Sequence, residues 1–78
     1  MKKRVYIIKQ VEGRHTHIVN GDAFQNYNKA LEALEEKARF YNVPGFEAVR
    51  DSVLNDQFYL KENGRIIGQM FIECLTLI

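Results

Sequence analysis

Two histidines, His15 and His17, are the first residues whose type and spacing could do chemistry. Residues two apart in a strand project from the same face, so both imidazoles could reach one metal ion. A structural zinc site needs four ligands, and no further Cys, His or acidic pair occurs nearby at ligand spacing. We therefore interpret both as solvated side chains of a hairpin, and we expect neither a metal nor another cofactor.

The single cysteine, Cys74, and the acidic residues of segment 32–36 are the other candidates for catalysis. Cys74 lies in an apolar stretch without an adjacent base, whereas reactive thiols need an electropositive, accessible setting. We interpret it as a small buried core residue. Glu35 and Arg39 are four residues apart and can pair on a helix surface, which explains the acids as a solvated face. Because no acid, base and nucleophile converge, we predict that the protein is not an enzyme.

Basic residues with aromatic neighbours could instead contact nucleic acid, because exposed rings on a sheet stack bases while cations hold the phosphates. These residues are Lys2, Lys3, Arg4, Tyr6, Arg14, Tyr59, Lys61 and Arg65. Eleven basic and ten acidic side chains leave a net charge of only +1, so the chain has no strong field toward phosphate. A small nucleic-acid-binding accessory protein, using basic hairpin ends and exposed aromatics, is therefore the alternative function.

Length and composition indicate one soluble domain over residues 1–78, with 46% apolar and 27% charged residues. One cysteine cannot close an internal disulfide, which fits a reducing cytosol. The apolar run 5–8 is too short for a signal peptide, and segment 71–78 is too short to span a bilayer. We expect a cytoplasmic protein without a membrane segment.

Residues 27–42 form the only segment with sustained helical periodicity. Its apolar side chains share one stripe: Tyr27, Ala30, Leu31, Leu34, Ala38 and Tyr41. Either Asn26 or Asn28 can cap the first turn, and Val43-Pro44-Gly45 ends the helix. Such a helix must lay its stripe on a sheet built from the flanking segments.

The flanking segments read as strands at residues 2–11, within 15–24, at 46–53, at 57–61 and from 66 onward. Asn63-Gly64 is a strong hairpin signal, because both residues tolerate positive φ. Counting outward from that turn places Glu62 opposite Arg65, Leu60 opposite Ile67 and Tyr59 opposite Gly68. The sequence therefore predicts an α+β domain of order β-β-α-β-β-β, an antiparallel sheet with one helix packed across one face.

The strands carry more apolar surface than one helix can cover. Either Tyr6 and Ile8 or Val5 and Ile7 must lie on the uncovered face, as must either Ile67 and Phe71 or Met70 and Ile72. Strong sheet twist, or a bulge that exchanges the two faces, would account for this without a partner. An exposed apolar patch would instead mark a protein interface.

We favour the interface, and Phe40 agrees with it because it points away from the helix stripe. The expected partner is a host protein or a protein–nucleic acid complex, and a homodimer is a further option. The partner-binding candidates are Tyr6, Ile8, Arg14, Phe40, Tyr59, Lys61 and Arg65.

The order of these elements also resembles a known group of proteins. An opening Val5-Tyr6-Ile7-Ile8-Lys9-Gln10-Val11 strand, one alanine-rich helix and a Leu60-Lys61-Glu62-Asn63-Gly64 hairpin are similar to the small phage anti-CRISPR proteins of five strands and one helix. This resemblance implies a non-enzymatic inhibitor from a phage or mobile element. Such an inhibitor would dock on a CRISPR surveillance complex and block its access to target DNA.

Overall fold

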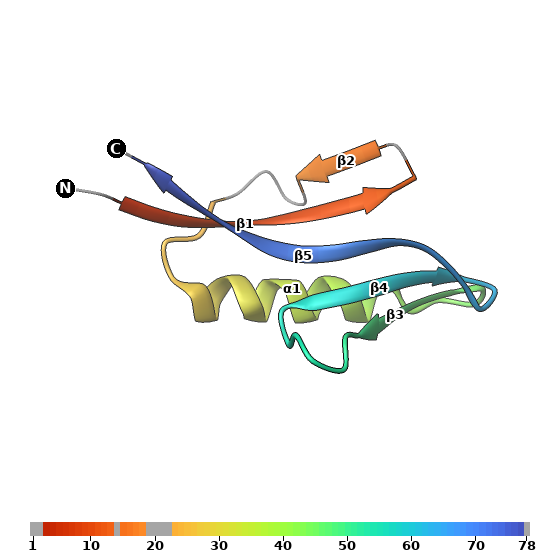
Figure 1. Cartoon of the computed structure of the whole chain (residues 1–78). Helices are drawn as coiled ribbons and strands as arrows, with labels where there is room; N and C mark the ends of the chain where they lie inside the picture. Colours follow the sequence, from red (N-terminus) through yellow and green to blue (C-terminus); the bar gives the residue numbers. More distant parts are fainter. Residues whose placement is uncertain (1–2, 14, 19–22, 78) are drawn as a thin grey trace.

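The helix α1, Tyr27–Tyr41, packs across one face of an antiparallel sheet in the computed structural model of the chain (Figure 1). The structure describes residues 3–13, 15–18 and 23–77. The strands are β1 (Lys3–Glu12), β2 (His15–Ile18), β3 (Phe46–Arg50), β4 (Gln57–Glu62) and β5 (Arg65–Leu77). The predicted α+β class, the antiparallel pairing and the packing of the helix on the sheet are confirmed.

The two longest strands, β1 and β5, lie next to each other inside the strand order β2-β1-β5-β4-β3. They pair without interruption from Lys3 opposite Leu77 to Glu12 opposite Gly68. β2 is a four-residue strand that pairs with the end of β1 at the edge of the sheet. The part of the sheet that carries the helix therefore consists of β1, β5, β4 and β3.

Local signals fix both ends of α1. The side chain of Asn26 accepts hydrogen bonds from the backbone N–H groups of Asn28 and Lys29, which identifies it as the cap between the two predicted asparagines. At the other end Asn42 donates through Nδ2 to the carbonyl oxygen of Ala38 at 2.7 Å, and the chain then turns at residues 43–45. The helix therefore presents one fixed stripe to the sheet, with Ala30, Leu34 and Ala38 buried.

The core lies between this stripe and the covered sheet face. Four large side chains are almost completely buried: Ile8, Leu34, Leu60 and Met70. Ala38 and Phe58 complete the cluster. The core is small, as expected for a chain of this length, so each member carries a large share of the burial energy.

In the β4–β5 hairpin the predicted register is correct next to the turn and wrong beyond Lys61. Asn63 has φ of 50° and Gly64 of 83°, and Glu62 pairs with Arg65, as predicted. A β-bulge then shifts the register between Leu60 and Lys61, so Leu60 lies opposite Gly68. The predicted Leu60–Ile67 and Tyr59–Gly68 pairs are wrong, because a bulge adds a residue that counting from the turn cannot detect.

Candidate protein-binding surface

The sheet face opposite α1, which we call the free face, follows from strand alternation and register. Ile8, Phe58, Leu60 and Met70 point to the helix, so their strand neighbours point away from it. The residues of the free face include Val5, Ile7, Lys9, Val11, Glu47, Val49, Gln57, Tyr59, Lys61, Gln69, Phe71, Glu73 and Leu75.

The free face is less uniformly apolar than the sequence suggested. Val5 and Ile7 lie on it but are each only 8% exposed. In its middle, Lys9 forms an ion pair with Glu73, and the Nε2 atom of Gln57 donates to Oε1 of Gln69 at 2.9 Å. Accessible apolar surface is therefore confined to parts of this face.

One such part is a hollow at the β4–β5 hairpin end of the sheet, which we call the hairpin hollow. It has a volume of about 380 Å³ and is lined by Val11, Gly13, Tyr59, Ile66, Ile67, Gly68 and Gln69. The bulge, which displaces the chain beside Ile67, lies next to it. Ile66 is 63% exposed, although it is a large apolar residue within a strand. Ile66 and the hollow beside it are therefore the candidate contact surface at this end of the sheet.

Near the hairpin hollow, each of two basic residues lies opposite an acidic residue on the neighbouring strand. Lys61 lies opposite Glu47, and Arg65 lies opposite Glu62. The pKa of Tyr59 is raised, chiefly by its hydrogen-bonding contact with the carboxylate of Asp51. The rim of the hollow thus offers both charge signs and favours a neutral or mixed partner over a polyanion.

Three of the seven predicted binding residues belong to the β4–β5 hairpin, and one of them lines the hollow. Tyr59 lines the hollow, Lys61 pairs with Ile66, and Arg65 is exposed at the turn. The sequence reading missed Val11 and Ile66, and it named Ile67 only as one of two alternatives for the uncovered face. The bulge that groups them has no clear signal in the sequence.

The other four predicted residues lie elsewhere. Ile8 is completely buried under α1, so its prediction as a binding residue is corrected: its position in the strand turns it to the helix. Tyr6 is half-buried on the same side, where its ring packs edge-on against the ring of Tyr27. The two ring centroids are 5.6 Å apart. Phe40 is 73% exposed on the outer side of the helix. Arg14 lies outside the residues that the structure describes.

A second exposed apolar feature is the loop between β3 and β4. Val53 is 85% exposed and Leu54 is 50% exposed. Their backbone N–H groups both donate to the Oδ1 atom of Asp51, each at 2.8 Å, and these two bonds hold the pKa of Asp51 below its usual value. The signal that could have revealed this loop is the pair of apolar residues between the turn-forming Asp51 and Asn55.

We predict that replacing Asp51 with alanine lowers the thermal stability at neutral pH, because the loop loses both bonds. Since the pKa of Asp51 is lower in the folded chain than in the unfolded chain, this stabilisation is fully present above the unfolded-state pKa and is lost as the pH falls through the folded-state pKa. Asp51→Asn keeps an acceptor oxygen and should retain most of the stability. Thermal melts from pH 2 to pH 7 measure this; equal melting temperatures for wild type and Asp51→Ala at pH 7 would contradict it.

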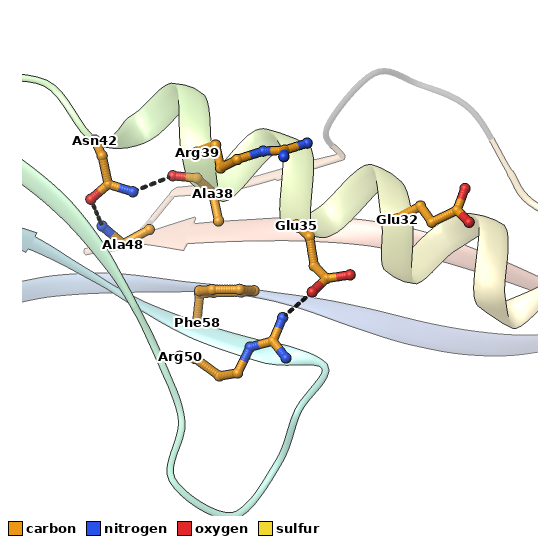
Figure 2. A pocket seen from close by; sticks show the side chains of 8 residues that line it. All are labelled: Glu32, Glu35, Ala38, Arg39, Asn42, Ala48, Arg50 and Phe58. Carbon is orange, nitrogen blue, oxygen red and sulfur yellow. Dashed lines mark hydrogen bonds and ion pairs between the residues drawn. The ribbon is translucent and has the colours of Figure 1, made fainter.

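A groove of about 380 Å³ separates α1 from β3 (Figure 2). Across it the Nη2 atom of Arg50 donates to Oε2 of Glu35 at 2.5 Å, while the guanidinium lies 5.0 Å from the centre of the Phe58 ring. The expected Glu35–Arg39 pair is therefore replaced by Glu35–Arg50, because the edge of the sheet brings a competing cation to the same carboxylate. The ion pair between Glu35 and Arg50 therefore links the helix to the edge strand of the sheet.

Cys74 is exposed, so the prediction that it is a core residue is wrong. It lies on the helix side of β5 but past the point where β4 ends, where little packs against the strand. Among residues 3–13, 15–18 and 23–77, no group of three or more His, Cys, Asp or Glu side chains is placed to hold a metal ion. The helix of the described chain is not long and apolar enough to cross a bilayer. The side chains of His15 and His17 lie outside the described part of the structure.

Comparisons with protein-family models, with curated proteins and with solved structures give no match to this chain.

Proposed function

We propose that this chain is a small, non-enzymatic protein-binding domain that docks on a partner protein or protein–nucleic acid complex through the hairpin hollow. The observation that carries the proposal is the 63% exposure of Ile66 beside that hollow. Burying apolar surface is the main driving force of protein association, and aromatic residues such as Tyr59 are enriched in the centres of interfaces. The balanced charges of the rim fit a protein surface of mixed charge better than bare nucleic acid.

The specific class that we propose is an inhibitor of a CRISPR surveillance complex. Its support is the resemblance in length and in order of elements described above. The test is the binding of target DNA by a panel of purified surveillance complexes with and without the protein. Stoichiometric loss of DNA binding is the expected result for one of them.

The alternative, binding of single-stranded nucleic acid, has one observation in its favour. Tyr59 and Phe71 are diagonal neighbours on the free face, since Tyr59 lies opposite Gln69 and Phe71 opposite Gln57. Two rings so placed could stack adjacent bases. The cation opposite Phe71, Lys9, is already paired with Glu73, which weakens the attraction for phosphate. Affinity for an oligonucleotide that falls steeply with salt would favour this alternative.

We predict that Ile66→Asp weakens capture of the partner at least tenfold, because a charge would have to be desolvated in the interface. The matched control is Phe40→Asp, which places the same charge at a similarly exposed apolar site on the helix. The measurement is affinity capture from host lysate with and without nuclease, followed by titration of the recovered protein. Recovery of bulk nucleic acid alone, or loss of the partner with Phe40→Asp and not with Ile66→Asp, would defeat the proposal.

A further inference from the structure

The C-terminal half of β5 has a neighbouring strand on one side only. β4 stops at Gln57, which lies opposite Phe71, and the last contact on that side is a bond from the Ile72 N–H to the carbonyl oxygen of Asp56 at 3.3 Å. β5 then continues to Leu77 beside β1 (Figure 1). Residues 73–77 thus form an open edge within the sheet.

The direction of the backbone groups along this edge follows from their neighbours. The N–H and C=O groups of Tyr6 bond to Phe24 on the far side of β1, so those of Val5 and Ile7 face β5 and bond to residues 75 and 73. Cys74 and Thr76 must therefore direct their N–H and C=O groups to the open side. No bond from another described residue reaches these four groups. Cys74, Leu75 and Thr76 are all exposed, so the edge is accessible.

The β3 edge of the sheet is capped, whereas this edge of β5 is open. On β3, the N–H of Ala48 donates to Oδ1 of Asn42, and Phe46 exchanges two backbone bonds with Val43. Natural sheets block edges with such caps, with proline or with lysine, because an open edge pairs with another strand. Segment 73–77 contains no proline and no lysine. Its one charged residue, Glu73, is already paired with Lys9.

We propose that this edge pairs with the same edge of a second copy, antiparallel and about a two-fold axis at Leu75. In that register Cys74 lies opposite Thr76 of the second copy, and Thr76 opposite its Cys74. All four outward groups of each copy are then satisfied by the four of the other, so the edge is self-complementary. Because segment 73–77 of neither copy carries an unpaired charged side chain, no like-charge repulsion within this segment opposes the contact.

The single chain is more extended than a compact monomer of its mass. Its accessible surface is 5644 Å² for 9.1 kDa, whereas a compact monomer of that mass exposes about 4,900 Å². The radius of gyration is 12.9 Å, against about 11.5 Å for a compact chain of this length. The hairpin hollow lies at the opposite end of β5, so this contact is separate from the proposed docking surface and does not depend on it.

Sedimentation equilibrium of the full chain tests the pairing. We expect a dimer that Thr76→Pro weakens at least tenfold, since this change removes an outward N–H that β1 does not use. Its melting curve should remain cooperative, because all bonds to β1 remain. If Thr76→Pro does not fold, Thr76→Lys serves the same purpose by charging the edge. A monomer at all concentrations, or a dimer that neither variant weakens, would overturn the proposal.

Cross-linking tests the register. In Cys74→Ser/Leu75→Cys the two introduced thiols face each other across a pair without hydrogen bonds, with Cα atoms about 4.5 Å apart, which a disulfide can bridge. In the matched control, Cys74→Ser/Thr76→Cys, the thiols are diagonal, about 7–8 Å apart, and bridge poorly. We expect mild oxidation to give at least tenfold more covalent dimer at position 75. Equal yields, or a higher yield at position 76, would contradict the two-fold axis at Leu75.

Discussion

Gly68→Ala is expected to lower the free energy of unfolding by about 3 kcal/mol, because an overpacked site that meets backbone cannot relax at low cost. A Cβ atom at this position would lie 2.0 Å from the carbonyl oxygen of Val11 and 3.1 Å from Cα of Glu12. Both are atoms of β1, and Gly68 lies at the end of the long β1–β5 pairing. To make room, the two central strands would have to separate.

Urea unfolding followed by circular dichroism measures this loss. The control is Gly13→Asn: Gly13 has φ of 59° with no atom within 4 Å of the added Cβ, and asparagine tolerates this conformation. A small change is expected for the control. A Gly68→Ala protein as stable as the wild type would show that β1 and β5 are not packed as closely as described.

Leu34→Ala should cost about 3 kcal/mol, the usual penalty for emptying a buried leucine site. Leu34 is completely buried, and it lies in the middle of the helix stripe against Ile8, Leu60 and Met70. No other element of the described chain can fill the space, because α1 is the only helix there. The loss in unfolding free energy should therefore include both the transfer free energy of the removed side-chain atoms and the cost of the cavity that they leave.

The matched control is Leu54→Ala, the same truncation at a residue that is 50% exposed in the β3–β4 loop. It should change the free energy of unfolding by less than about 0.5 kcal/mol. Urea titrations of both variants provide the comparison. Similar losses for the two would mean that α1 does not form the centre of the core.

The elements that sequence reasoning predicted well are those that local chemistry specifies. The Asn26 cap, the stop at Pro44 and the Asn63-Gly64 turn each depend on neighbouring residues only. Apolar residues of both parities occur in β1 and β5, which are the two longest strands and lie inside the sheet.

The errors lie where distant contacts decide. The face to which Ile8 points depends on the side from which α1 approaches, and alternation alone allowed either choice. Glu35 meets Arg50 only because β3 runs beside the helix. Cys74 was predicted to be buried because its neighbours are apolar, yet β4 ends before it. Predicting the hairpin hollow would have required predicting the bulge at Leu60 and Lys61, and no residue pattern in that segment reveals this bulge.

The two proposed contacts use different parts of one sheet and can operate together. The hairpin hollow lies at the turn end, beside Ile66 and Tyr59, and the open β5 edge lies at the opposite end. A dimer paired through β5 would present two hollows, and a partner with two matching sites would bind it more tightly than it binds one copy. The Thr76→Pro variant would separate these contributions, because it leaves the hollow unchanged.

The central claim is that the chain binds a protein through the hairpin hollow. The most direct measurement is an NMR titration of the isotope-labelled chain with the protein recovered by capture. We predict that the largest backbone shift changes cluster at Val11, Tyr59, Ile66 and Gln69, with little change along the outer side of α1 or in the groove beside Arg50. Changes centred on Phe40 or on that groove, with the hairpin unaffected, would contradict the claim.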